Sequence, residues 1–465
     1  MGMSESEIQG HLRDERNRYY NELIPPVYEK GKFPPGFKLA PTGWALTHEV
    51  VHRPDVEATI GGEKRMIRPI GTMDVEFLDN ELVEAARQKK TDLQHNYPCG
   101  LHCPGCFSED PIFQDSSRLM KWEEVFEKID EARKFGLTSI KFLGPGELFQ
   151  NKDLFKILDA CEKRGLDISV FTKGAEIGSD ELVEKIYGPQ GIHTADALVE
   201  RISKYKHLRI LLGFNSFDPR LQDAMVGSFN ATTNYAIKDN TFVNRGVAGY
   251  TDIRNAALVR LVKAGFNDPK YGQRLSLIAA PLMLKQVDEI ADMYEWAALR
   301  NIPLVTAPSM ESGPKSVNLS NSNHRADAAH DTMAGMFAKL YQRAIDIGTM
   351  TKDRIEAEGI SAYPGTAPCN QVANGLFMRL NGQVQMCPGR SSADAVFGNV
   401  HDKPLVEIWA ESQNYAHGAA DNNWCGAKRQ GMPIEMRKKV EDRLGLSHAD
   451  RATASKPEAG VASSL

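Results

Sequence analysis

The apolar positions in the middle of the chain alternate between helical and strand-like spacing. Apolar residues recur at helical spacing over 122–135, and Gly136 then follows as a helix stop. Residues 138–143 form a short apolar run with β-branched members, which is typical of a buried strand. The pattern recurs as a helix followed by a strand at 154–163 and 167–171, at 253–263 and 274–280, and at 287–300 and 302–306, with a further strand at 208–214.

A repeated order of helix, stop residue and buried strand predicts parallel βα units. Ligands of such sheets bind at the carboxyl ends of the strands. Polar segments follow three of the predicted strands, at residues 144–147, 172–174 and 215–216. We therefore expect these segments to surround one binding mouth, together with a cysteine-rich loop that precedes the first helix.

That loop carries Cys99, Cys103 and Cys106 in the spacing C-x3-C-x2-C. Iron–sulfur clusters usually take four thiolates, so three without a fourth nearby suggest a cluster with one open iron. A zinc site completed by another ligand is the alternative. The chain has seven cysteines, six of them in two groups, which favours metal ligation in a reducing compartment over disulfides. The seventh, Cys161, lies in a helical pattern, and we expect it to be a small buried hydrophobic residue.

The cysteine spacing resembles the cluster-binding loop of the radical S-adenosylmethionine (SAM) enzymes. The resemblance implies that Cys99, Cys103 and Cys106 bind a 4Fe–4S cluster whose open iron is chelated by SAM. It also implies reductive cleavage of SAM to methionine and a 5′-deoxyadenosyl radical, which removes a hydrogen atom from the substrate. The fold it implies is a partial (β/α)6 TIM-like barrel, a mixed α/β architecture.

Gly144-Pro145-Gly146-Glu147 follows the first predicted strand of the repeat and resembles the Gly-Gly-Glu motif of that family. Glycine permits close backbone approach, and a carboxylate can pair with an ammonium group. The resemblance therefore implies that Gly144, Gly146 and Glu147 bind the methionyl part of SAM, with Pro145 replacing a glycine. It extends more weakly, with ordinary turns as the alternative, to Phe107, Thr172, Asn215 and Ser216 as further SAM contacts.

A second group of cysteines comprises Cys369, Cys387 and Cys425. A hairpin is predicted around Asn381-Gly382, and a Gly-Asn turn and an Ile-Trp helix follow. This order resembles the auxiliary-cluster domain of the SPASM and Twitch radical SAM enzymes. The single-cluster Twitch form fits best, because too few cysteines remain for two clusters.

The final cysteine of that pattern is missing, since Lys428 stands where it is expected. Four alternatives stay open: an auxiliary 4Fe–4S cluster with an open iron, a non-cysteine fourth ligand, a zinc ion, or no metal. The candidate non-cysteine ligands are His401, His417 and Asp421. Candidate substrate-facing loop residues are Glu311, Lys315 and His401.

The expected organisation has five parts. These are an N-terminal extension over 1–90 with a helix at 73–90, the barrel over 91–310, a linker helix region over 311–360, the small C-terminal iron–sulfur domain over 361–445 and a disordered tail over 446–465.

Composition narrows the class of partner. The 465-residue chain has a formal net charge of −5, which argues against a nucleic-acid partner. It has neither an apolar run long enough to span a bilayer nor a signal-peptide segment, so we expect a cytoplasmic protein without membrane contact. The resemblance adds an electron donor such as flavodoxin or ferredoxin.

The expected function is hydrogen abstraction from a small sugar- or aminocyclitol-like substrate, with net oxidation or epimerisation as the outcome. A radical SAM enzyme that modifies a ribosomal peptide is the alternative. A non-catalytic zinc-binding protein is the rival from another class.

Overall fold

The computed structural model describes residues 18–39, 53–89, 103, 116–144, 146–226, 235–238, 241–244, 249–280, 282, 284–307, 327–360, 374–390, 395–418 and 432–446. All structural statements below refer to these residues. Among the helices within these ranges, none has the length and apolar character needed to cross a membrane.

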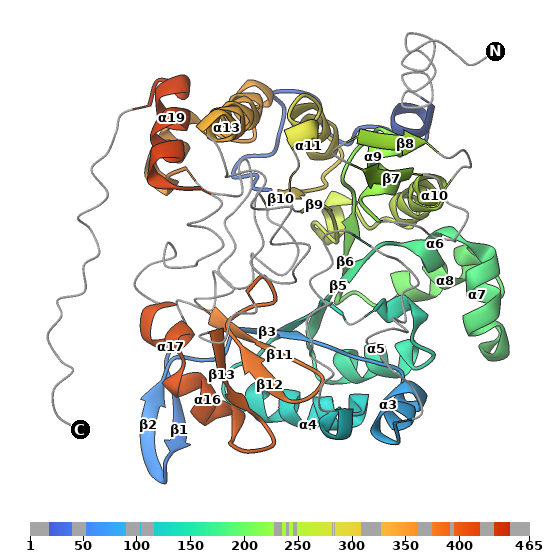
Figure 1. Ribbon diagram of the computed structural model, residues 1–465, viewed down its shortest axis with the longest axis vertical. Coiled ribbons are helices and arrows are strands. Elements are labelled where there is room, and N and C mark those ends of the chain that lie inside the picture. Colours follow the sequence, from blue (N-terminus) through green and yellow to red (C-terminus); the bar gives the residue numbers. More distant parts are fainter. Residues whose placement is uncertain are drawn as a thin grey trace, which may run out of the picture.

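A single sheet in the order β10-β9-β6-β5-β4-β3-β11-β12-β13 organises the molecule (Figure 1). Its first six members run parallel to one another, and their spatial order follows their order in the sequence. Helices connect successive strands, so this half is the partial (β/α)6 barrel that the sequence predicts. The six strands are β3 (Thr72–Val75), β4 (Ser139–Phe142), β5 (Asp167–Thr172), β6 (Leu208–Gly213), β9 (Leu275–Ala279) and β10 (Leu304–Thr306).

The helices of the barrel form where apolar residues recur on one face. The stops at Gly136, Gly165 and Gly265 all have positive φ, as helix-terminating glycines commonly do. The helices of this part are α4 (Trp122–Arg133), α5 (Leu154–Lys163), α6 (Ala175–Gly178), α7 (Asp180–Tyr187), α8 (Ala195–Ser203), α9 (Pro219–Ala224), α10 (Tyr250–Lys263), α11 (Ile290–Ala298) and α13 (Asp327–Ile347).

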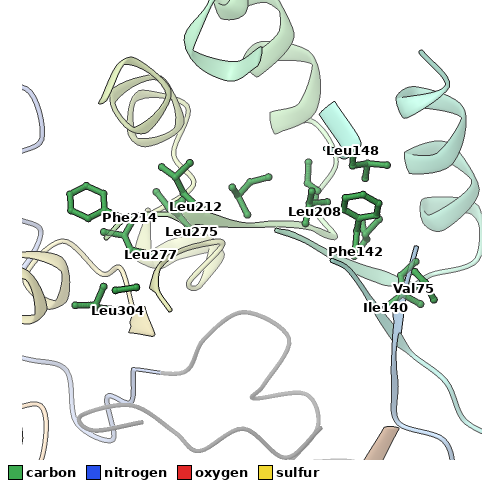
Figure 2. Close-up of a cluster of buried hydrophobic side chains, with 14 of the residues drawn as sticks. Val75, Ile140, Phe142, Leu148, Leu208, Leu212, Phe214, Leu275, Leu277 and Leu304 are labelled. Carbon is green, nitrogen blue, oxygen red and sulfur yellow. The ribbon is translucent and has the colours of Figure 1, made fainter. Parts of the chain in front are cut away.

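Alternation along the strands separates two faces of the sheet. Most of the labelled side chains in Figure 2 come from successive strands, and they gather in one apolar layer, which includes Ile140, Phe142, Leu212 and Leu277. The opposite positions on the same strands are polar in several places, as at Asp74, Lys141, Ser169 and Ser276, all of them buried. The helices pack against the apolar layer, and the polar positions lie on the opposite face of the sheet.

The expectation of one helix over 73–90 is wrong in its first part. Thr72–Val75 is strand β3, and the helix, α3, spans only Asn80–Arg87. Met73 and Val75 are fully buried in register with Ile140 and Phe142 of β4, which favours a strand. Asp79 caps α3 by accepting a hydrogen bond from the Glu81 amide and so fixes the later start of the helix.

The C-terminal part continues the sheet from β3. Strand β11 (Gly375–Met378) runs parallel to β3, and β12 (Gln383–Gln385) pairs with β11 as the predicted hairpin. Strand β13 (Val396–Asn399) and helix α16 (Leu405–Glu411) complete the unit, with Trp409 fully buried. The remaining elements are η1 (Arg18–Glu22), β1 (Val56–Ile60), β2 (Glu63–Ile67), η3 (Ser116–Arg118), η4 (Leu148–Gln150), η5 (Gly188–Gln190), β7 (Tyr235–Lys238), β8 (Thr241–Asn244), η6 (Pro269–Tyr271), η7 (Leu284–Gln286), α14 (Lys352–Glu358), α17 (Gln413–Gly418) and α19 (Ile434–Leu444).

Substitution of Phe142 by alanine should reveal how strongly the apolar layer holds the barrel. Phe142 is fully buried and stacks on Phe77 with ring centroids 6.4 Å apart. The free energy of unfolding should fall by about 3–5 kcal/mol, because a large buried side chain is lost and a cavity remains. Urea titration against Met66→Ala, an exposed strand position, provides the comparison. Equal stability of the two variants would contradict the layer's importance.

Candidate functional site

The loop after β4 places a carboxylate at the carboxyl end of the sheet. Gly144 and Gly146 adopt φ values of 123° and 74°, which a residue with a side chain rarely adopts. Their conformation turns the chain so that Glu147 is 9% exposed and points back at the neighbouring strand. The glycines of the predicted SAM motif are therefore needed for the turn itself.

The end of β5 holds the Glu147 carboxylate at both of its oxygens. The Thr172 hydroxyl donates to Oε2 at 2.6 Å, and the Lys173 amide donates to Oε1 at 2.8 Å. The same hydroxyl accepts from the Gly174 amide at 2.8 Å. Thr172, predicted as a SAM contact, thus acts here on the orientation of Glu147.

Gly174 keeps this junction close-packed. Its φ is 75°, and a β-carbon at this position would lie 2.7 Å from a methyl carbon of Leu212. Only glycine fits both the backbone conformation and the contact. The ends of β4, β5 and β6 are therefore fixed relative to one another.

Glu147 shares its buried surroundings with a second acid, Glu176, on the first turn of α6. Burial raises the pKa of Glu147 well above its usual 4.5, and the charge of Glu176 raises it further. The hydrogen bonds from Thr172 and Lys173 oppose this shift. A nearby cation would favour the ionised carboxylate, so the site is suited to an ammonium group.

Cys103 is the described member of the first cysteine group, and it lies near the same strand ends. Tyr250 of α10 donates from its hydroxyl to the Lys173 carbonyl at 2.5 Å. Burial raises the pKa of Tyr250, and the charges of Glu147 and Cys103 raise it further. Cys103 and Glu147 therefore both lie within electrostatic range of one tyrosine. Cys99, Cys106 and Phe107 lie outside the described residues.

The loop after β6 carries the predicted contacts Asn215 and Ser216, both buried. Gln222 accepts hydrogen bonds from their amides at 2.7 and 3.3 Å. The Ser216 hydroxyl bonds to the Glu289 carboxylate. Arg254 donates to Gln222 at 3.0 Å and to the Ser216 carbonyl at 3.4 Å. The loop is thus held from α9 and α10, and contact of Asn215 and Ser216 with SAM stays a prediction.

Sequence reasoning missed the residues that hold this loop, which include Gln222, Arg254, Gln286 and Glu289. Arg254 is fully buried, with its guanidinium carbon 3.7 Å from the centre of the Phe214 ring. Its signal in the sequence is a charge among the apolar positions of a helix, a pattern that surface helices also show. Only the fold reveals that it faces the strand ends.

Of the second cysteine group the structure describes Cys387, which is half-buried and lies two residues after the end of β12. His401, one candidate fourth ligand, has its Nε2 atom 3.0 Å from the Arg118 carbonyl oxygen. The structure does not describe Cys369, Cys425, Glu311, Lys315, Asp421 or the side chain of His417. Within the described ranges no cluster of three metal-ligating side chains occurs. The auxiliary ligand set stays a prediction.

Fold and site together define an α/β protein with the Cys103 thiol and a buried carboxylate near the ends of the barrel strands. The family model of the radical SAM superfamily matches residues 93–238, and the SPASM iron–sulfur cluster-binding domain matches residues 369–428. The chain therefore contains a radical SAM domain and a C-terminal SPASM domain. These matches decide against a non-catalytic zinc protein.

Solved structures that the chain is similar to include native anSMEcpe with bound AdoMet, at 12% identity and a TM-score of 0.47, covering 80% of this chain and 97% of that chain. Streptococcus suis SuiB bound to precursor peptide SuiA is 14% identical, with a TM-score of 0.40, covering 78% and 71% of the two chains. A search of curated proteins found no match.

The domains imply a 4Fe–4S cluster with SAM and, in the SPASM domain, auxiliary iron–sulfur clusters. The described residues fit the 4Fe–4S cluster and SAM. Cys103 supplies a half-buried thiol, and Glu147 supplies a fixed, buried carboxylate whose pKa is raised by burial and by the charge of Glu176.

The raised pKa of Glu147 predicts a pH dependence of stability without SAM. Neutral Glu147 contributes stability that is fully present below the usual pKa of 4.5 and is lost as pH rises through the raised value. Glu147→Gln cannot ionise. Between about pH 5 and about pH 8 it should therefore lose less stability than the wild type, by up to about 1.4 kcal/mol per pH unit.

Urea titrations of the SAM-free protein across this range measure the difference. Glu63→Gln, at an exposed position of β2, is the matched control and should keep the wild-type slope. Identical slopes for Glu147→Gln and the wild type would show that Glu147 is not held neutral.

Proposed function

We propose that this radical SAM enzyme abstracts a hydrogen atom from a small sugar- or aminocyclitol-like substrate. The observation that carries the SAM assignment is the Glu147 carboxylate, fixed by Thr172 and Lys173 at the carboxyl end of the barrel sheet. The substrate class is supported by the single small set of cysteines in the C-terminal domain and by an N-terminal region without a recognisable peptide-binding motif.

The residues that would hold the groups follow from their positions. Cys99, Cys103 and Cys106 would ligate the 4Fe–4S cluster, and Glu147 would pair with the SAM amino group beside the Gly144 turn. Bound together and reduced by a donor such as flavodoxin or ferredoxin, these groups supply a 5′-deoxyadenosyl radical that takes the substrate hydrogen.

The chain's own residues prepare this site. Thr172 and the Lys173 amide keep both Glu147 oxygens oriented, so pairing with an ammonium group needs little rearrangement. The carboxyl must lose its proton as it gains this partner, because its pKa is raised without one. Beside this carboxyl, the Lys173 carbonyl accepts a hydrogen bond from Tyr250, and Gly174 packs closely against Leu212.

Cys369, Cys387 and Cys425 would hold the auxiliary group, which would supply a second site for electron transfer. This makes a net oxidation of the substrate the favoured outcome, with epimerisation as the second. Strand β12, which precedes Cys387, belongs to the same sheet as the barrel strands.

Cys103→Ala tests the first cysteine group. Anaerobically reconstituted protein should lose the iron and sulfide of one cluster and form no 5′-deoxyadenosine with dithionite and SAM, because a cluster ligand is gone. Iron and sulfide assays and chromatography of the nucleoside measure both effects. Cys161→Ala, a buried helix cysteine outside both groups, should retain them. Unchanged SAM cleavage by Cys103→Ala would contradict the assignment.

Cys387→Ala tests the second group separately. It should lower the iron content while leaving measurable SAM cleavage, since the first cysteine group is intact. The same iron and nucleoside assays apply to it. Iron equal to that of the wild type would refute a cluster at Cys387.

A further inference from the structure

A second pair of buried acids, Asp74 in β3 and Glu76 just after its end, takes no part in the arrangement around Glu147. Asp74 and Glu76 are two residues apart, so their side chains emerge on the same face. Their exposed fractions are 0% and 1%. Buried carboxylates are rare unless they are paired or bind something, so this pair needs a physical explanation.

Each acid has one anchored oxygen and one without a partner. Lys141 Nζ on β4 lies 3.0 Å from Asp74 Oδ1, and the Leu380 amide donates to Glu76 Oε2 at 2.7 Å. Throughout the part of the chain that the structure describes, Asp74 Oδ2 and Glu76 Oε1 receive no hydrogen bond. Buried polar atoms are nearly always satisfied in native proteins, so these two oxygens indicate a missing hydrogen-bond donor.

The charges around the pair are balanced. Burial raises the pKa of Asp74 to about 6 and that of Glu76 to about 7. The positive charges of Lys141 and Arg379 oppose these shifts. Because each acid faces its own cation, a further charged group would be costly here, and a neutral donor suits the free oxygens best.

Hydroxyl groups extend the same face onto β4. The strand register places Thr72 beside Ser139 and Asp74 beside Lys141. Ser139 is 2% exposed, and within the described ranges its hydroxyl likewise has no hydrogen-bond partner. Strand β4 continues directly into the Gly144 turn and Glu147, so this polar face leads to the proposed SAM position.

We propose that Asp74, Glu76 and Ser139 form a substrate subsite that binds the hydroxyl groups of a neutral polyol. The inference rests on the proposed function and specifies its substrate as a hydroxylated ring. Side chains on one face of a strand repeat at about 7 Å, a span that a single six-membered polyol ring can bridge. Hydroxyls donate to the two free carboxylate oxygens and accept from Ser139.

Binding of simple probes to the SAM-loaded, reconstituted protein tests the subsite without requiring turnover. Saturation-transfer NMR with myo-inositol and D-glucose should detect binding of at least one of them. Asp74→Asn and Glu76→Gln should each weaken it by about tenfold or more, because an amide donor replaces the free acceptor oxygen in the same shape. Asp159→Asn, on the outer helix α5 and bonded to Tyr205, should bind like the wild type.

Three results would overturn the proposal. The wild type could bind neither polyol, or both variants could bind the polyols as tightly as the wild type does. The third is binding of N-acetyl-dialanine amide, instead of the polyols, that the two substitutions weaken. The last would assign the pair to peptide amides. Glu76→Gln keeps the Leu380 bond and tests the subsite even if Asp74→Asn, which disturbs Lys141, fails to fold. Failure of the proposed function is separate, since it appears as absent 5′-deoxyadenosine formation from SAM and dithionite.

Discussion

The hydrogen bonds that hold the Glu147 carboxylate are the interaction on which the site depends. Burying a carboxylate costs free energy, and the Thr172 hydroxyl and Lys173 amide recover part of that cost. The remainder is visible as the raised pKa of the acid. A cation that enters beside it would recover more. The glycines at 144 and 174 make this geometry possible, since side chains there would strain or block the turns.

Strand β3 has a comparable role at the scale of the whole molecule. It pairs with β4 on one side and with β11 on the other, so it joins the barrel to the C-terminal unit that carries Cys387 (Figure 1). Its two inward acids each face a cation from a different neighbour, Lys141 on β4 and Arg379 after β11. The same strand thus joins the barrel to the C-terminal unit and carries a polar group on the sheet face opposite the apolar layer.

Most barrel elements could be predicted because their signals are local. A helix-stop glycine before a β-branched run marks β4 and β5, and the Asn381-Gly382 turn marks the C-terminal hairpin. Strand β3 was missed because four residues with one central acid, followed by Phe77 and a true helix, mimic helical spacing. Its strand character comes from pairing with β4 and β11, which are distant in sequence.

Site residues that belong to a sequence motif could be predicted, whereas site residues that only the fold brings together were missed. Glu147 and Thr172 were expected at one mouth, and they are hydrogen-bonded to each other. Arg254, Gln222 and Glu289 converge on the loop after β6 from different elements, and no spacing in the sequence relates them. Asp74 and Glu76 were likewise not singled out, because a lone acid in a short apolar run gives no indication of its partner.

The most direct test of the central claim is a crystal structure of the reconstituted protein with SAM bound. The account predicts the SAM amino nitrogen within hydrogen-bond distance of a Glu147 oxygen, with the Thr172 and Lys173 bonds to that carboxylate retained. A SAM amino group held elsewhere, with Glu147 bonded to Thr172 and Lys173 alone, would contradict it.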